Sequence, residues 1–197
     1  MIVLVNTHYH RQFSTVIGYF QTTLNRLNMN LDFLNISNPS EMEFKTIANK
    51  LFNYFAIQTY DSTYRITDME FYWNSVSHKD ESTYHRKYVD PKSGEWFFHY
   101  SGVDIALKNE TTGGYGGILL RAVYDITHDK LYKGPMVCAM RLFSGTSAFE
   151  TAIQTKIVQH TFPKVDLNMS PRIGLGKNAK KNDADKLPYR FFITHIK

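Results

Sequence analysis

The spacing of hydrophobic residues changes along the chain, from three or four positions near the start to two positions after residue 60. Over residues about 12–28 the helical spacing predicts an amphipathic helix. A second helix is predicted after the turn SNPSEME, where Ser40 is the expected N-cap and Glu43 completes a capping box. Its apolar face consists of Phe44, Ile47, Ala48, Leu51 and Phe55. We expect residues 1–40 to form a helical extension packed on a domain of residues 41–197.

A period of two in TYDSTYRITDMEFYW predicts two strands joined by a turn at Asp61-Ser62. In the second strand Met69, Phe71 and Trp73 face one side, whereas Asp68, Glu70 and Tyr72 face the other. Further strands are predicted in GEWFFHYSGVDIAL, ILLRAVYDI and PYRFFITHI, with a turn at GGYGG, a polar loop over 74–93 and a helix over about 147–159. Neighbouring strands joined by short turns indicate a single α+β domain with an antiparallel or mixed sheet flanked by helices.

Composition narrows the class of protein. Of the 197 residues 43% are hydrophobic and only Cys138 is a cysteine, so neither a disulfide nor a CxxC metal pair is available within the chain. No secretory signal and no run of about 18 apolar residues is present, and we therefore expect a cytoplasmic protein that does not enter a membrane. The histidines lack multi-ligand spacing, and GGYGG lacks the Lys-Ser/Thr of a phosphate-binding loop. We predict neither a metal site nor a cofactor.

The positive charge is concentrated at the C-terminal end of the chain. Residues 172–197 hold seven Lys/Arg and two Asp/Glu, which accounts for the whole net charge of +5. A local basic segment in an aromatic-rich protein favours a polyanion partner, most commonly nucleic acid. A solvated lysine loop at KNAKKNDADK explains the same residues equally well.

Two predicted strands each carry one charged residue among apolar neighbours, Glu70 in DMEFYW and Arg121 in ILLRAVY. Burying either charge alone is costly, so these residues should pair, reach solvent or line a pocket. A structural ion pair or an exposed strand face would account for them. Tyr72 and the aromatic residues of 96–100 favour a pocket for a planar base, in which a carboxylate activates water for hydrolysis.

The order of several motifs resembles the alkyladenine (3-methyladenine, or methylpurine) DNA glycosylase family over about residues 45–197. The motifs in question are TIANKLFNYFAIQ, ITDMEFYW, GEWFFHYSG, LLRA, the Gly134-Pro135 pair, RIGLG and KLPYRFFI. The resemblance implies a curved, mostly antiparallel sheet, base flipping, and hydrolysis of the N-glycosidic bond without a metal. Ser101 stands where the family has its duplex wedge, and Lys108 stands near its guanine-screening asparagine.

The resemblance also implies roles for individual residues. Glu70 would activate water, with Arg121 and the backbone carbonyl near Ile173 orienting it. The extruded base would be held by Tyr72, His78, Phe98 and Tyr100. From the basic segment we expect contacts with the DNA backbone by Arg172, Lys177, Lys180, Lys181 and Arg190.

Three functional hypotheses follow from these observations. The first is a monomeric base-excision glycosylase that removes alkylated or deaminated purines, of the 3-methyladenine or hypoxanthine type, from double-stranded DNA. The second is a non-catalytic nucleic-acid or nucleoside binding module on the same fold. The third is a protein-interaction domain that uses its exposed aromatic residues.

Overall fold

The computed structural model describes residues 31–88, 92–145, 149, 155–194 and 196. The chain divides into two units, Met1–Asp32 and Phe33–Lys197, and almost all described residues belong to the second. The helix predicted over residues about 12–28 lies outside the described residues.

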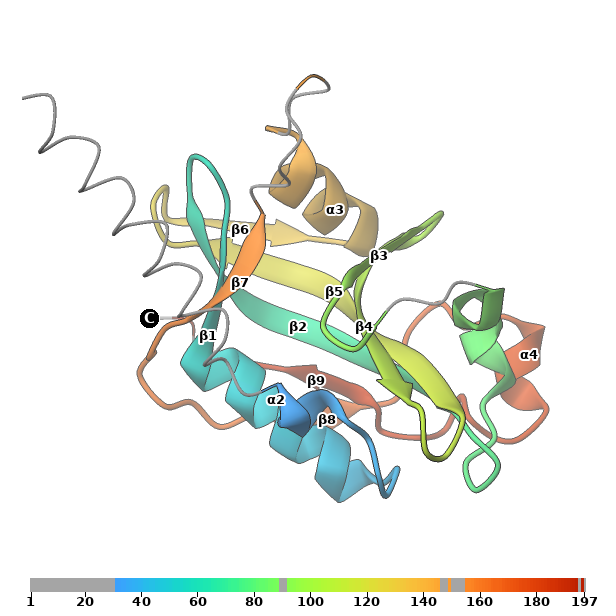
Figure 1. The fold of residues 1–197 in the computed structure, drawn as a ribbon. Helices are drawn as coiled ribbons and strands as arrows, with labels where there is room; N and C mark the ends of the chain where they lie inside the picture. The colour runs from blue at the N-terminus through green and yellow to red at the C-terminus, as the bar shows by residue number, and fades with distance from the viewer. Residues whose placement is uncertain (1–30, 89–91, 146–148, 150–154, 195, 197) are drawn as a thin grey trace, which may run out of the picture. The chain divides into compact units, whose positions relative to one another are not determined.

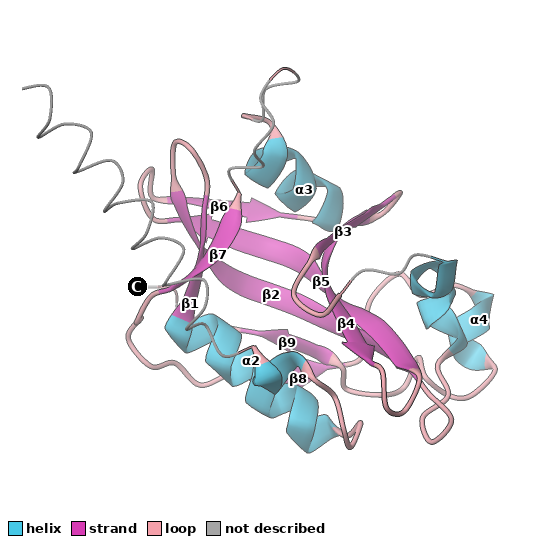
Figure 2. Ribbon diagram, viewed as in Figure 1, coloured by secondary structure: helices cyan, strands magenta, loops and turns pink. Residues whose placement is uncertain are grey.

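The second unit is an α+β domain built on a curled antiparallel sheet, as predicted (Figures 1 and 2). The main path of the sheet has the order β3-β4-β5-β2-β1-β7, while β6 pairs with β5, and β9 pairs with both β2 and β8. The strands are β1 (Phe55–Gln58), β2 (Thr63–Asn74), β3 (Trp96–His99), β4 (Gly102–Asn109), β5 (Gly114–Asp125), β6 (Lys130–Lys133), β7 (Lys156–Gln159), β8 (Asn168–Ser170) and β9 (Arg190–Phe192). The helices are η1 (Asp32–Leu34), α2 (Glu41–Tyr54), η2 (Glu81–Tyr88), α3 (Pro135–Phe143) and α4 (Lys177–Lys180).

Strand β2 is the centre of the sheet and separates two environments. It pairs along most of its length with β5, and on its other edge with β1 and β9. Met69, Phe71 and Trp73 point into the apolar core and have no exposed surface. Phe71 stacks on Phe44 of α2 with ring centroids 5.0 Å apart. The alternation predicted for this strand is therefore confirmed on its apolar face.

Helix α2 begins as its sequence predicts, but it ends at Tyr54, so Phe55, which was predicted on its apolar face, is the first residue of β1. The Ser40 hydroxyl accepts a hydrogen bond from the backbone N–H of Glu43 at 3.2 Å. The Glu43 carboxylate does not return to Ser40; it accepts from the N–H groups of Ser37 and Asn38. It therefore stabilises the turn before the helix, which positions α2 over the apolar face of the sheet.

Several elements differ from those expected, among them β7 and the start of β5. The helix predicted over about 147–159 is wrong for Lys156–Gln159, which form β7 beside β1. GGYGG is a turn only at its first glycine, because β5 starts at Gly114 and runs through the other glycines. A Cβ on Gly116 would lie 2.0 Å from the Tyr72 carbonyl oxygen. Glycine there permits the close approach of β5 to β2, and this approach outweighs the tendency of glycine to form turns.

Candidate functional site

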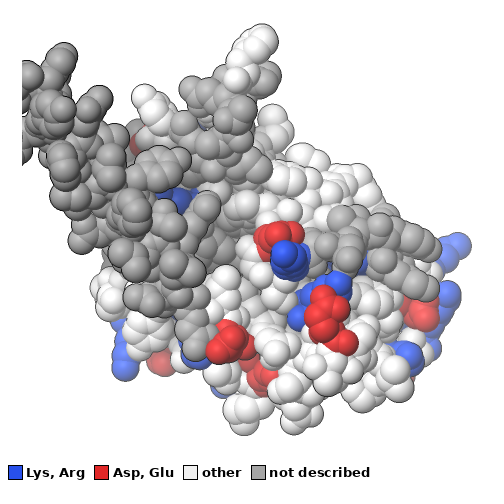
Figure 3. Space-filling model, in the orientation of Figure 1, with Lys and Arg blue, Asp and Glu red and all other residues white. Residues whose placement is uncertain are grey.

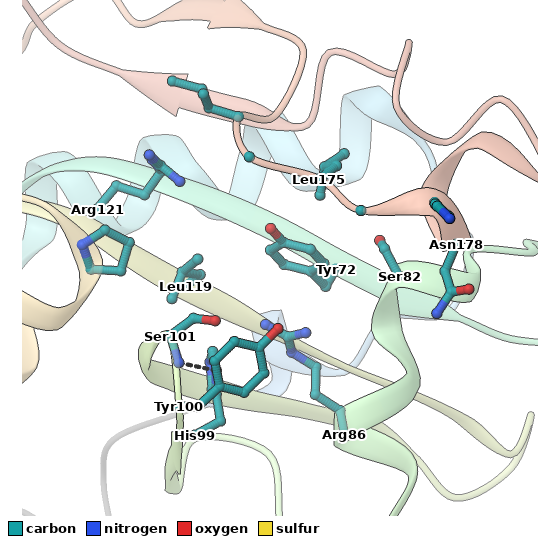
Figure 4. A pocket seen from close by; sticks show the side chains of 15 residues that line it. Tyr72, Ser82, Arg86, His99, Tyr100, Ser101, Leu119, Arg121, Leu175 and Asn178 are labelled. Atoms are coloured by element: carbon teal, nitrogen blue, oxygen red, sulfur yellow. Dashed lines mark hydrogen bonds between the residues drawn. The ribbon is translucent and has the colours of Figure 1, made fainter.

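A pocket of about 490 Å³ lies on the face of the sheet opposite the α2 core (Figure 4). Its walls come from β2 and β5, the turn between β3 and β4, the η2 segment, the start of α3, and residues 173–178, which lead into α4. This volume falls within the range of pockets that hold small molecules, roughly 300–1,000 Å³. Three lining side chains are basic, namely Arg86, Arg121 and Lys177, and none is acidic.

Glu70 lies directly behind the pocket wall and has no exposed surface. One carboxylate oxygen accepts the backbone N–H of Ile173 at 2.8 Å and lies 3.1 Å from Arg121 Nη1. The other accepts the Tyr72 hydroxyl at 2.9 Å. All three donor residues line the pocket. Of the outcomes expected for Glu70 and Arg121, the structure shows pairing, and the three donors close over the carboxylate so that it does not reach solvent.

The register of the sheet explains why these residues meet. Leu119 of β5 is the Cα partner of both Glu70 on β2 and Asp104 on β4, so the three side chains form one row across the sheet. Arg121 is two positions beyond Leu119, on the same face, and is therefore a diagonal neighbour of Glu70. The row places two buried carboxylates on either side of Leu119, and both are covered by cations.

Tyr72 is held between charged groups rather than open for stacking. The guanidinium carbons of Arg86 and Arg172 lie 4.1 and 4.5 Å from its ring centroid. Burial, reinforced by the charge of Glu70, raises the pKa of the Tyr72 hydroxyl above its usual value. The hydroxyl therefore keeps its proton and donates a hydrogen bond to Glu70. A base could stack on this ring only where a guanidinium moves aside.

Arg172 has a different place from the one predicted. Its side chain is fully buried, bonds Asp80 at 2.7 Å and donates to the carbonyl oxygens of Phe71 and Ala184. It cannot reach a DNA backbone from there. Since Ile173 follows it directly, Arg172 anchors the loop whose N–H group contacts Glu70. Arg190 is likewise engaged, bonding Asp68 at 2.7 Å across β9 and β2.

The predicted base-binding residues divide into two groups. Tyr72 and Tyr100 line the pocket, and Tyr100 is 71% exposed in the turn between β3 and β4. His78 packs on Phe44 and Tyr189 and does not line the pocket. Phe98 is half exposed and packs edge-to-face on Phe143, also outside the pocket.

A second buried charge cluster was not predicted. Arg86 Nε lies 2.5 Å from one Asp104 oxygen, and His99 Nε2 lies 3.1 Å from the other. His99 Nδ1 accepts the Ser101 N–H at 3.3 Å, so the ring proton is on Nε2 and bonds Asp104. Burial opposes ionisation of Asp104, but Arg86 and His99 outweigh it and lower its pKa. The acidic residue within the apolar run VDIAL was the available signal, the same one that singled out Glu70.

The exposed basic residues lie close to one another in the chain. Lys177, Lys180 and Lys181 of α4 and its C-cap are exposed, and Lys177 also lines the pocket. Figure 3 shows basic side chains along the edge where Figure 1 places α4. The predicted basic surface is thus a lysine surface, since the two arginines assigned to it are engaged in ion pairs.

Comparisons with protein-family models, with curated proteins and with solved structures find no match for this chain. Within the described residues, no group of three or more His, Cys, Asp or Glu side chains could hold a metal ion. None of the described helices is long and apolar enough to cross a membrane.

Proposed function

We propose that this protein is a monofunctional DNA glycosylase that hydrolyses the N-glycosidic bond of a damaged purine. The observation that carries the proposal is the Glu70 carboxylate behind a pocket of about 490 Å³, contacted by three pocket-lining groups, from Tyr72, Arg121 and Ile173. A general base must lie within hydrogen-bond reach of the water that it activates. A pocket of this size accommodates one extruded nucleotide.

The proposed step begins when water separates Arg121 from Glu70. Arg121 is the most suitable group to move, because 18% of its side chain is exposed whereas Glu70 has no exposed surface. Glu70 then takes a proton from the water, whose oxygen forms a bond to C1′ of the sugar. The bond from C1′ to the purine nitrogen breaks, and the base leaves with the electron pair. Arg121 would hold the water from its other side.

DNA would reach the pocket across the surface formed by α4 and the turn between β3 and β4. Lys180 and Lys181 offer exposed positive charges for phosphates, and Tyr100 projects from the rim. Gly102 holds this turn close to α3, since a Cβ there would lie 2.8 Å from Pro135. A fixed, exposed aromatic ring beside a pocket is suited to replacing a base that has left the stack.

The proposal is tested by single-turnover release of bases from duplex oligonucleotides that carry hypoxanthine, 1,N6-ethenoadenine or 3-methyladenine. We expect wild-type protein to release at least one of them and Glu70→Gln to slow release by about 100-fold or more. Glu81→Gln removes an exposed carboxylate and should leave the rate unchanged. Release by Glu70→Gln at the wild-type rate would exclude the proposed mechanism.

A second function, binding without catalysis, is favoured by one specific observation: Glu70 has no exposed surface and already accepts three contacts. In that case the carboxylate holds Tyr72 and the loop at Ile173 in place. The protein would then bind DNA with a clear salt dependence yet release no base from any duplex in the panel. Absence of DNA binding at low salt would exclude both functions.

A further inference from the structure

The cluster of Arg86, Asp104 and His99 is built into the wall of the pocket rather than being a surface ion pair. Asp104 has no exposed surface and Arg86 is 5% exposed. The backbone of β5 leaves room for the pair because residue 117 is glycine. A Cβ on Gly117 would lie 2.4 Å from an Asp104 oxygen and 2.8 Å from Arg86 Nε. Tyr72 supports the guanidinium from β2, with Arg86 Cζ 4.1 Å from its ring centroid.

This arrangement leaves one edge of Arg86 unused. Asp104 occupies Nε, and within the described part of the chain neither Nη group of Arg86 has a hydrogen-bond partner. Several described side-chain atoms have neither a hydrogen-bond partner nor access to solvent, but the Nη atoms of Arg86 are not among them. Since Arg86 lines the pocket, its free edge is available to a ligand (Figure 4). An arginine fork with both Nη groups free matches two neighbouring acceptor atoms in one plane.

The chemistry of purines identifies the group that fits this edge. A 6-oxopurine presents two adjacent acceptors, O6 and N7, and this is the pair that arginine recognises most often. Adenine presents a donor in place of O6, and 7-methylguanine has no free acceptor at N7. No acidic side chain lines the pocket to accept the amino group of adenine. The site therefore favours a 6-oxopurine over adenine or an N7-alkylated purine.

We propose that Arg86 is a specificity-determining residue that donates both Nη groups to O6 and N7 of a 6-oxopurine, of the hypoxanthine type, held in the pocket. The inference rests on the proposed function, and among damaged purines it narrows the substrate class to those that carry O6 and an unsubstituted N7, as hypoxanthine does. Asp104 acts as the positioning residue, because it fixes Nε and so turns the free edge towards the pocket. His99 holds the second oxygen of Asp104.

Calorimetric titration with nucleosides tests the proposal without requiring any hydrolysis. Inosine should bind wild-type protein about 10- to 100-fold more tightly than 7-deazainosine, which lacks only the N7 acceptor, and than adenosine. Arg86→Lys keeps the charge but loses the planar fork, and should remove this preference. Lys186→Gln, a change at an exposed lysine outside the pocket lining, should retain it. Equal affinities for the three nucleosides, or no measurable binding, would overturn the proposal.

Two further measurements separate the alternatives. If inorganic phosphate competes with inosine and Arg86→Lys abolishes the competition, Arg86 recognises an anion and the assignment to O6 and N7 is wrong. If Arg86→Lys does not fold, the pair Arg86→Gln with Asp104→Asn removes both buried charges together and is titrated instead, with the same expected loss of preference. Base release without a preference for inosine would refute only this inference, whereas preferential inosine binding without base release would refute only the glycosylase.

Discussion

The two faces of β2 are closed to a similar extent but by different means. Met69, Phe71 and Trp73 are covered by apolar and aromatic side chains, with Phe44 of α2 and Phe191 of β9 stacked or edge-on against Phe71. On the other face the cover of Glu70 is polar and comes from groups that also line the pocket. Burial alone therefore does not distinguish core from site in this strand. The chemical nature of the cover does.

The energetic consequences of the two covers also differ. Apolar cover stabilises the fold directly through the surface it removes from water. Buried ion pairs contribute little net stability, although removing one partner leaves a costly uncompensated charge. Each buried charge on the polar face therefore needs a partner, and the apolar face has no such requirement. Substitutions on the two faces should therefore differ in how much they lower the free energy of unfolding.

Truncation in the apolar face should have the largest effect. Phe71→Ala removes a fully buried ring between α2 and β9, and we expect the free energy of unfolding to fall by about 3–5 kcal/mol. Urea denaturation followed by circular dichroism measures the loss. Phe98→Ala, at a half-exposed ring, is the matched control and should cost distinctly less. Equal costs would show that the α2 core is not the principal source of stability.

Neutralising the buried carboxylate should have an intermediate effect. Glu70→Gln keeps the shape of the side chain but sets its amide group against a donor, so we expect a loss of about 1–3 kcal/mol in the same denaturation experiment. Glu110→Gln, at an exposed residue, should change stability by less than about 0.5 kcal/mol. A Glu70→Gln protein as stable as wild type would mean that water, not the donors at Tyr72 and Ile173, contacts the carboxylate in solution.

A smaller effect than that of Glu70→Gln should come from His78, which packs on Phe44 of α2, and it should appear in the pH dependence of stability. Burial lowers the pKa of His78 from its usual value near 6.5, opposed by the nearby Asp80 and assisted by Arg172. The unfolded chain then binds the proton more readily than the folded one, so stability is present above the unfolded pKa and is lost as pH falls through the folded pKa. Wild-type protein should lose stability between pH 7.5 and 5.5. His78→Phe should lose less over the same interval, and identical losses would argue against a buried neutral imidazole.

Substitution of an exposed lysine should have the smallest effect on stability. Lys181 lies 4.0 Å from Glu81 with both side chains largely exposed, so Lys181→Gln should alter the free energy of unfolding by less than about 0.5 kcal/mol. If the α4 surface binds DNA, the same change should reduce the slope of log affinity against log salt concentration by about 0.9. Fluorescence anisotropy at several salt concentrations measures that slope. An unchanged slope would remove Lys181 from the DNA surface.

Local sequence signals predicted much of the fold. The N-cap at Ser40, the apolar face of α2 from Phe44 to Leu51 and the turn at Asp61-Ser62 were confirmed, because capping, helical spacing and hairpin turns depend on residues close together in the chain. The helix expected over about 147–159 was wrong where β7 forms. Lys156–Gln159 complete the edge of β1, and pairing with a distant strand outweighs the local preference for a helix.

By itself the sequence determined that Glu70 and Arg121 should pair, reach solvent or line a pocket, since isolated charges among apolar residues are costly to bury. Only the tertiary structure decided that they partner each other, that His78 and Phe98 lie away from the pocket, and that Arg172 is an internal anchor. The pairing of Arg86 with Asp104 was equally inaccessible, because it depends on the register of β4 against β5 and on the space at Gly117. Charge and period are local properties, whereas the identity of a partner is set by strand register and loop placement.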